Sequence, residues 1–273
     1  MNNSKNPVKE TLKKRYPNMN EFLFETSYFL LKHIINEKGL NEILLKNGKF
    51  YGIDFANAIL NYLNINYNLH GKIPDEGRYI FTSNHPSNGI DGNILMSAVG
   101  GKNKNIKFFV ADFISEYENY KDIFLPTDFS GKKGRENTKK VINALESNSQ
   151  IIIFPAGDIS VKIKDKIRDI PWNSSVVNWS KKYERDIVPV YFNGKNSNLF
   201  YLVSRLRLFF KIKGNLEKLF MVREITSQRG KTFDIVFGEP IPYQNFTNEK
   251  TSKEWADQIY NKVYSLEEKL IRI

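Results

Sequence analysis

The amino-acid sequence predicts an α/β fold, with a mixed, partly parallel central sheet flanked by helices and preceded by an N-terminal helical region. Short apolar runs of the kind that form buried strands recur from residue 65 onwards. Segments with a helical spacing of apolar residues separate several of these runs, which favours parallel strands joined by helices. The chain has 273 residues, of which 41% are hydrophobic, so it can bury a substantial core.

The front of the chain is predicted to be helical. Residues 1–19 are polar and contain proline, and we interpret them as a loose arm. Residues 20–36 and 53–63 carry apolar residues at helical spacing. We therefore expect an N-terminal helical region at residues 1–63, packed on a main α/β domain of residues 64–273.

The remaining elements follow from the apolar pattern. The expected strands cover residues 65–69, 79–81, 106–110, 123–125, 151–154, 187–192 and 233–237. The expected helices cover residues 91–99, 136–145 and 174–183, and the charged amphipathic tail at 253–270. Pro189 lies inside one strand, and because proline has no N–H to donate, we expect that strand to be at a sheet edge, bulged, or ending there.

The composition limits the class of partner and the kind of chemistry. The net charge of +11 and the 14% of aromatic residues favour an anionic partner, which can be a nucleic acid, a lipid headgroup or a phosphorylated substrate. The absence of cysteine excludes disulfides, thiolate metal sites and thiol catalysis. We see no signal-peptide pattern and no apolar run near the roughly 20 residues that span a bilayer. We expect a cytoplasmic protein that touches a membrane without crossing it.

A polar turn between two apolar runs holds the most informative residues. His85 and Asp91 lie in the segment 83–92, directly after the expected strand 79–81. A carboxylate that accepts from one imidazole nitrogen fixes the tautomer and leaves the other nitrogen to act as a base. The alternative is that His85 caps the next helix and Asp91 is an ordinary carboxylate of its first turn. The position at the carboxyl end of a strand favours the catalytic interpretation.

Two other turns have the composition of an anion site. The segment 126–135 combines two glycines with Lys132, Lys133 and Arg135, which suits a phosphate, although a solvated basic loop is an equal alternative. The turn at Phe154-Pro155-Ala156-Gly157-Asp158 exposes backbone N–H groups that can hold a phosphate or an oxyanion. An ordinary exit from a strand is the alternative for this second turn.

Residues 199–213 interleave large apolar residues with four cations. Such a helix is either core with snorkelling cations or an interfacial anchor on anionic lipid, and the net charge favours the anchor. The expected membrane contacts are Phe200, Arg205, Arg207, Phe209 and Phe210. The remaining histidines, His33 and His70, have no comparable acid nearby, and no metal-ligand spacing is present, so we expect no metal.

Four motifs now stand in order along the chain. They are Asn84-His85 with Asp91, the Gly-Lys-Lys-Gly-Arg segment at 131–135, Phe154-Pro155-Ala156-Gly157, and Val188-Pro189-Val190. The ordered set resembles the glycerolipid acyltransferase family over roughly residues 65–245. It is most similar to the bacterial branch of lysophospholipid or hemolysin-like acyltransferases.

The resemblance implies a reaction, its partners and its site. It implies transfer of a fatty acyl group from acyl-carrier protein or acyl-CoA to the hydroxyl of a lysophosphatidate-like lysolipid, without a covalent acyl-enzyme and without a cofactor. His85 would be the base and Asp91 the residue that orients it. The enzyme would lie on the anionic inner face of the cell membrane. The implied substrate contacts are Asn84, Lys132, Lys133, Arg135, Phe154, Pro155, Gly157 and Asp158.

The chain departs from the common family pattern at two places. Five residues separate His85 from Asp91 where the family has four, and Gly89 can supply the added flexibility. Ala156 stands where the third motif has glutamate, and Asp158 is a candidate to replace that carboxylate. The second departure makes a lyso-aminolipid, such as an N-acylated ornithine or glycine, an alternative acceptor.

Other functions remain open at the level of sequence. The same histidine can activate water, which would give a thioesterase or a lipid hydrolase. A nucleic-acid-binding protein is compatible with the charge, but the cations are dispersed and no binding motif is present, so we expect no nucleic acid. A membrane scaffold without activity leaves the paired His85 and Asp91 unexplained.

Overall fold

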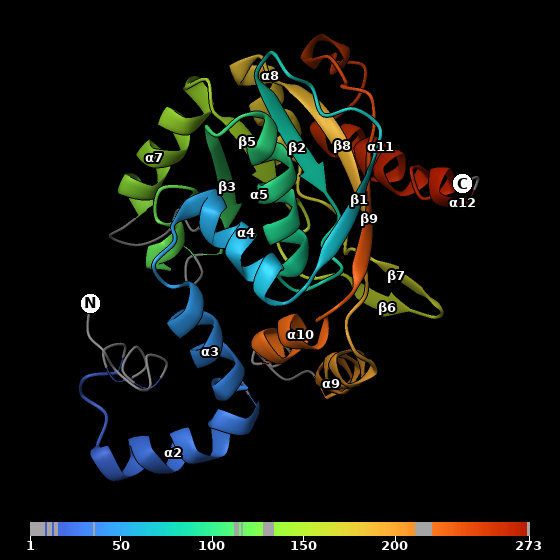
Figure 1. The fold of residues 1–273 in the computed structure, drawn as a ribbon. Helices are drawn as coiled ribbons and strands as arrows, with labels where there is room; N and C mark the ends of the chain where they lie inside the picture. The colour runs from blue at the N-terminus through green and yellow to red at the C-terminus, as the bar shows by residue number, and fades with distance from the viewer. Residues whose placement is uncertain are drawn as a thin grey trace.

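The computed structural model describes residues 9, 13, 16–34, 36–111, 115, 117–127, 134–210 and 220–271, without the side chains of residues 30, 31, 33, 34, 207 and 208. Within these residues, seven strands form one sheet and two short strands form a separate hairpin (Figure 1). The sheet strands are β1 (Asn66–His70), β2 (Tyr79–Ser83), β3 (Ile106–Val110), β4 (Phe124–Pro126), β5 (Gln150–Ile153), β8 (Asp186–Asn193) and β9 (Thr232–Phe237). The hairpin strands are β6 (Val161–Ile163) and β7 (Lys166–Arg168).

The sheet is mixed and mostly parallel. Its strand order is β1-β9-β8-β2-β5-β3-β4. Strands β8, β2, β5, β3 and β4 run parallel to one another, whereas β9 runs antiparallel to β8 and parallel to β1. The predicted α/β class with a mixed, partly parallel sheet is therefore confirmed.

Helices cover both faces of the sheet (Figure 1). The helices α4 (Gly52–Tyr62) and α5 (Ile90–Lys102) pack on one face, and α7 (Gly134–Glu146), α8 (Ser175–Tyr183) and α11 (Ser252–Ser265) pack on the other. Successive residues of a strand point to opposite faces, and the core shows this directly. Phe81 belongs to the core on the α5 side, and its neighbour Ile80 belongs to the core on the α8 side.

Four further helices gather at one end of the molecule (Figure 1). They are α2 (Glu21–Ile34), α3 (Glu37–Asn47), α9 (Asn198–Phe209) and α10 (Met221–Ser227). The Asn36 amide donates to the Thr226 hydroxyl over 2.8 Å, which ties the start of α3 to α10. The short helix α12 (Glu268–Ile271) ends the described chain, and 3-10 turns occupy Glu118–Tyr120 and Tyr243–Asn245. None of the described helices has the length and apolar character needed to cross a membrane.

The structure differs from the sequence predictions at three places. The strand β8 is interior, between β9 and β2, and not at an edge. Opposite Pro189 the pairing is irregular: Val190 pairs with Phe237 and Ile187 with Ile241, so the extra residue lies in the partner segment 238–240 and not in β8. The helix α3 and the β6–β7 hairpin were not predicted.

Candidate active site

The active-site candidate lies at the carboxyl ends of β2 and β5, where the chain leaves for opposite faces of the sheet. Helix α5 follows β2 on one face, and α8 follows the β6–β7 hairpin on the other. Adjacent parallel strands with connections on opposite faces form a crevice at their carboxyl ends, and ligands bind there in open α/β sheets. His85 follows β2 and Phe154 follows β5, so both residues enter this crevice.

His85 and Asp91 form the hydrogen bond that the sequence predicts. The His85 Nδ1 atom lies 2.8 Å from Asp91 Oδ2. The Asp91 side chain is fully buried, whereas the His85 side chain keeps 18% of its surface exposed. Since the carboxylate accepts from Nδ1–H, the basic lone pair lies on Nε2. This arrangement fixes the tautomer of His85 and is chemically suited to a general base.

The backbone of the turn holds the Asp91 carboxylate in place. Oδ2 also accepts from the Ser87 N–H at 2.9 Å, and Oδ1 accepts from the N–H groups of Gly89 and Gly92 at 3.2 and 2.9 Å. The turn needs backbone angles that most residues avoid, because Asn88 has φ 47° and Gly89 has φ 107°. The fifth residue between His85 and Asp91 is thus absorbed in a left-handed turn.

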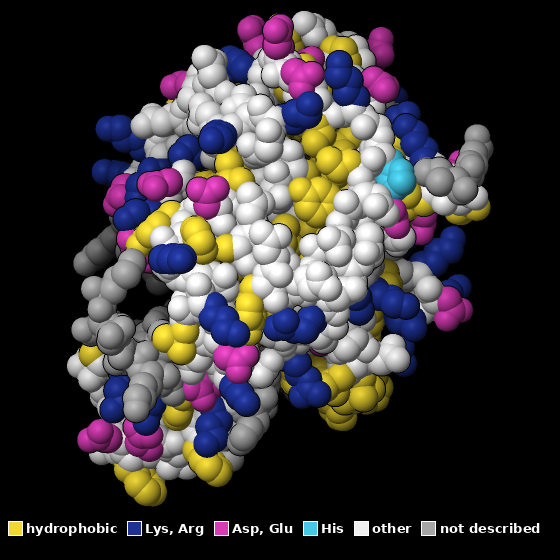
Figure 2. Space-filling model, viewed as in Figure 1, with side chains coloured by type: hydrophobic (Ala, Val, Ile, Leu, Met, Phe, Trp, Pro, Cys, Tyr) yellow, Lys and Arg dark blue, Asp and Glu magenta, His cyan; other side chains and the backbone are white. Residues whose placement is uncertain are grey.

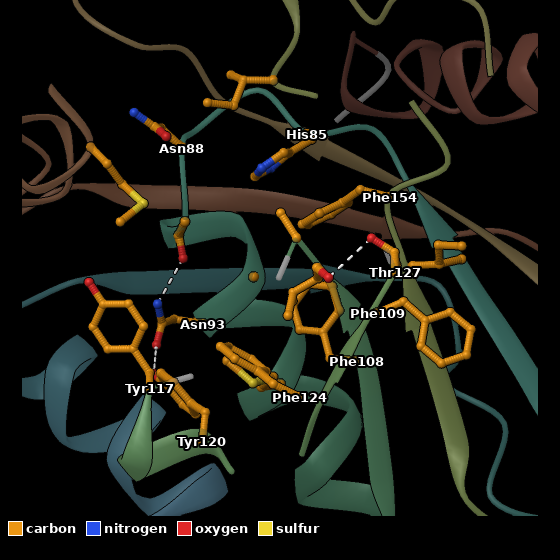
Figure 3. Close-up of a pocket in the computed structure, with 18 of the residues that line it drawn as sticks. His85, Asn88, Asn93, Phe108, Phe109, Tyr117, Tyr120, Phe124, Thr127 and Phe154 are labelled. Atoms are coloured by element: carbon orange, nitrogen blue, oxygen red, sulfur yellow. Dashed lines mark hydrogen bonds between the residues drawn. The ribbon is translucent and has the colours of Figure 1, made fainter. Parts of the chain in front are cut away.

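A largely apolar cavity opens beside the imidazole (Figure 3). Its volume is about 440 Å³, within the usual range of small-molecule sites. The His85 ring stacks on Phe154 with 4.1 Å between ring centroids and 9° between planes. The aromatic walls farther in include Phe55, Phe108, Phe109, Tyr120, Phe124 and Trp179. Asn93 is a polar group in this wall, and its side-chain oxygen accepts from the Tyr120 hydroxyl.

The charges around His85 favour a protonated ring. Burial by itself lowers the pKa of His85, but the Asp91 carboxylate and its hydrogen bond, together with Asp169 and Asp158, outweigh burial. The net pKa of His85 is therefore raised above its ordinary value. The same carboxylates favour the imidazolium form of His85 over the neutral ring.

Asn84 was predicted to contact substrate, and the structure corrects this prediction. Its side chain is 3% exposed. The amide nitrogen donates to the Phe192 carbonyl at 3.0 Å, and the amide oxygen accepts from the Phe192 N–H at 2.7 Å. Both ends of the amide are thus used to join the end of β2 to β8, and Asn84 positions the turn.

The other predicted substrate contacts fall into two groups. Phe154, Pro155, Gly157 and Asp158 all line the cavity. Arg135 is exposed in the first turn of α7 and does not line it, and Lys132 and Lys133 lie outside the described residues. No Lys or Arg is found among the described residues that line the cavity. The same described part of the chain contains no group of three or more His, Cys, Asp or Glu side chains placed to hold a metal ion.

The predicted membrane contacts are also divided. Phe200 is a second correction, because it is 2% exposed and packs with Tyr201 and Ile159 inside the protein. Arg205 is exposed, and Phe209 and Phe210 are 77% and 64% exposed. The Arg207 side chain lies outside the described part of the structure.

One carboxylate next to His85 had no signal in the sequence. Asp169 follows β7 and is 84 positions from His85, yet its Oδ1 accepts the His85 backbone N–H at 3.3 Å. Residues so distant in sequence come together only when the hairpin folds back on the turn. Neither spacing nor composition near Asp169 indicates this contact.

Comparison with known proteins places the chain in a family. The family model described as acyltransferase matches residues 10–271. The chain belongs to the acyltransferase family. It is thus an enzyme that transfers an acyl group, and the resemblance seen in the sequence is confirmed.

Curated relatives extend over almost the whole chain. A lyso-glycine lipid O-acyltransferase of Bacteroides thetaiotaomicron is 33% identical over 264 residues, which are 95% of this chain and 96% of that protein. A lyso-glycine lipid O-acyltransferase of Phocaeicola vulgatus is 33% identical over 247 residues, 89% of this chain and 88% of that protein. Among solved structures, the 1-acyl-sn-glycerophosphate acyltransferase PlsC of Thermotoga maritima has a TM-score of 0.48 at 15% identity, over 95% of this chain and 87% of that one.

Proposed function

We propose that this acyltransferase transfers a fatty acyl group from a thioester donor to the hydroxyl of a lyso-glycine lipid. The observation that carries the proposal is the His85–Asp91 pair at the mouth of an apolar cavity, in a chain one third identical to two lyso-glycine lipid O-acyltransferases. The donor is acyl-carrier protein or acyl-CoA. The two relatives, both lyso-glycine lipid O-acyltransferases, support this acceptor over a lysophosphatidate.

The proposed chemistry needs one base and no covalent intermediate. His85 Nε2 takes the proton of the acceptor hydroxyl, and the oxygen attacks the thioester carbonyl. The carbon–sulfur bond then breaks, and the thiolate takes the proton from the imidazolium. Asp91 holds the ring in the tautomer that starts the cycle and stabilises the charge in its middle.

The cavity suits the acyl chain of a substrate. Its aromatic and aliphatic walls extend from His85 to residues of α3 and α10, such as Ile43 and Ile225. Burial of hydrocarbon is favourable by about 0.8 kcal/mol for each methylene. An acyl chain in this cavity would present its carboxyl end to the imidazole.

An acyl-transfer assay with defined lipids tests the reaction. Purified protein is given acyl-carrier protein or acyl-CoA donors and lyso-glycine lipid, lyso-ornithine lipid, lysophosphatidate or no acceptor. We expect diacylated glycine lipid, and a loss of about 10²–10⁴-fold in His85→Ala. His70→Ala is the matched control, because His70 also bonds a carboxylate, Asp234 at 2.9 Å, but lies outside the cavity.

Three other results of this assay would each contradict one part of the proposal. Preference for lysophosphatidate contradicts the proposed acceptor. Release of free fatty acid without acceptor, at a rate equal to transfer, indicates a thioesterase or lipid hydrolase. Full activity of His85→Ala contradicts the proposed base.

We further propose that α9 and α2 bind the inner face of the cell membrane. Helix α9 turns Phe200, Tyr201 and Ser204 inward. Its outward face carries Leu199, Leu202, Leu206 and Phe209, which are 37 to 77% exposed. Their spacing of three, four and three residues places them on one side of a helix. The helix thus packs one side against the protein and turns a second apolar side to solvent, and a contiguous exposed apolar surface of this kind can be covered by a bilayer interface.

Helix α2 presents a similar surface at the same end of the molecule. Phe22, Leu23 and Phe29 are 82%, 55% and 62% exposed. Figure 2 shows hydrophobic side chains at this end, over α2 and α9, beside lysine and arginine side chains. The cations attract anionic lipid, each contributing about 1 kcal/mol close to the surface.

Vesicle sedimentation tests the membrane contact. Wild-type protein is expected to bind vesicles that contain phosphatidylglycerol, and Phe209→Asp to bind at least tenfold more weakly. Ile271→Asp is the control, because Ile271 is 80% exposed but lies on α12 and not on α2 or α9. Equal weakening by both substitutions would contradict the assignment of this surface.

A further inference from the structure

A buried carboxylate lies behind the catalytic turn and has no role in the chemistry described so far. The Asp169 side chain is 3% exposed. Its Oδ1 accepts from the His85 N–H at 3.3 Å and from the Ser160 hydroxyl, and its Oδ2 accepts from Trp172 Nε1–H at 2.8 Å. All three partners are donors, so the ionised carboxylate is satisfied without a proton of its own.

Ser160, the residue before β6, also forms a hydrogen bond with the backbone of His85. The Ser160 N–H donates to the His85 carbonyl at 2.9 Å. Because the Ser160 hydroxyl bonds to Asp169, the two backbone groups of His85 and the carboxylate close into one hydrogen-bonded unit. This unit fixes the position from which the imidazole extends into the cavity.

Aromatic residues of α11 fix the backbone of Asp169 in turn. The Asp169 N–H donates to the Tyr264 hydroxyl oxygen at 2.7 Å, and the Tyr260 hydroxyl donates to the Asp169 carbonyl at 3.2 Å. The neighbouring cation, Arg168, is directed elsewhere, because its guanidinium bonds Glu267 at 2.9 Å and stacks on Tyr264. The charge of Asp169 is therefore not neutralised by an ion pair in the described structure.

We propose that Asp169 is a positioning residue of the acyl-transfer reaction, which clamps the backbone of His85 and places a second negative charge behind its imidazole. The inference rests on the proposed function of His85 as the base. It assigns to the β6–β7 hairpin and the segment after it a task in catalysis. The hairpin brings Asp169 to a turn that is 84 positions away in sequence.

The charges that face His85 come from three elements. Asp91 contacts the ring from the start of α5, Asp158 lies in the turn after β5, and Asp169 lies after β7. All three raise the pKa of His85 against the lowering effect of burial. Around Asp169 itself the titratable groups are His85, Tyr260, Tyr264 and Arg168. Burial raises the pKa of Asp169 above its ordinary value, and the hydrogen bonds from Ser160, Trp172 and the His85 N–H oppose this effect.

The test is a titration of His85 that needs no substrate. The chain has three histidines, so a histidine-labelled sample gives few NMR signals, and His85→Gln identifies the one that matters. In Asp169→Asn we expect the pKa of His85 to fall, because a negative charge that favours the imidazolium is lost. The acid limb of the pH–rate profile moves to lower pH, and kcat on the alkaline plateau falls on the order of tenfold.

Two variants separate this role from a merely structural one. Glu224→Gln also removes a buried carboxylate, which is 1% exposed and accepts two bonds from Ser197. It is expected to lower stability and to leave the pKa of His85 and the acid limb unchanged. Trp172→Phe removes one donor to Asp169 but keeps its charge, and it is expected to leave the acid limb near that of the wild type.

The results that would overturn the role of Asp169 differ from those that would overturn the proposed acyl-transfer function. A folded Asp169→Asn with an unchanged pKa of His85 and an unchanged acid limb overturns the proposal. If Asp169→Asn does not fold, the carboxyl carbon of Asp169 in the wild type must show an inflection at the pKa of His85, since coupled titrations are reciprocal. No inflection there overturns it as well. If wild-type protein transfers no acyl group, the proposed function fails, whereas the titration still decides whether Asp169 acts on His85.

Discussion

The substitution Asp91→Asn tests the central hydrogen bond, because every lone pair used by this carboxylate faces a donor. Oδ2 accepts from His85 Nδ1 and the Ser87 N–H, and Oδ1 accepts from the N–H groups of Gly89 and Gly92. An asparagine has one oxygen and one NH₂ group. In either orientation the NH₂ group of the asparagine must face two groups that are hydrogen-bond donors in the wild-type protein.

The two orientations have different costs. With the NH₂ group toward Gly89 and Gly92, two backbone hydrogen bonds are lost and the turn loosens. With the NH₂ group toward His85, Nδ1 must become the acceptor, the ring proton moves to Nε2, and the base is lost. Loss of two bonds to a charged acceptor lowers the free energy of unfolding by about 3 kcal/mol. The wrong tautomer lowers kcat by about 10³–10⁴-fold, the scale of such a change in catalytic triads.

Initial rates of acyl transfer, urea unfolding and the nitrogen chemical shifts of His85 measure the three effects separately. Asp234→Asn is the matched control, because Asp234 also accepts from a histidine, His70 at 2.9 Å, but lies outside the cavity. We expect a far smaller loss of rate in this control. If Asp91→Asn keeps its rate within tenfold of the wild type while His85→Ala is inactive, the orienting role of Asp91 is refuted.

Two further predictions follow from charge and burial. Acyl transfer should rise with pH through a midpoint above the ordinary value of about 6.5, because the base must be neutral and the pKa of His85 is raised; a midpoint below that value contradicts the electrostatics. The stabilisation from the His85–Asp91 pair has the opposite trend, since a raised pKa in the folded state contributes at low pH and is lost as the pH rises through it. Arg185→Leu should lower the free energy of unfolding by about 3–5 kcal/mol, because the fully buried guanidinium donates to four carbonyls at the end of α7, at 2.5 to 3.1 Å. Urea unfolding measures this loss, and Arg168→Leu, at a partly exposed position, should cost far less.

The sequence predicted the fold class because the strands are apolar runs with few alternatives. Ile151 and Ile187 belong to strands that are buried on both faces of the sheet, and the continuous apolar runs of such strands are easily found in a sequence. The helix α3 was missed because Gly39 lies within it, and a glycine inside a helical pattern weakens the prediction of a helix. The β6–β7 hairpin was missed because its strands are only three residues long and rich in charge.

The site was predictable only where it is local in sequence. His85 and Asp91 belong to one turn, so their spacing carries the information. Asp169 and the inward face of α9 depend on packing between distant segments, which periodicity does not describe. Phe200 illustrates this limit. The segment around it has the composition of a membrane anchor, whereas the position of Phe200 on α9 turns its side chain into the core.

The reversed direction of β9 has a consequence for how this enzyme can change. Because β9 runs antiparallel to β8, the chain between Asn193 and Thr232 leaves the catalytic edge of the sheet and returns to the same edge. The described helices of this segment, α9 and α10, both lie at that end of the molecule (Figure 1). A segment of this kind can be lengthened, shortened or exchanged at small entropic cost to the sheet. Helix α10, which lines the cavity, and helix α9 are thus an exchangeable module, through which the proposed acceptor and membrane contacts can be altered while His85 and Asp91 stay fixed.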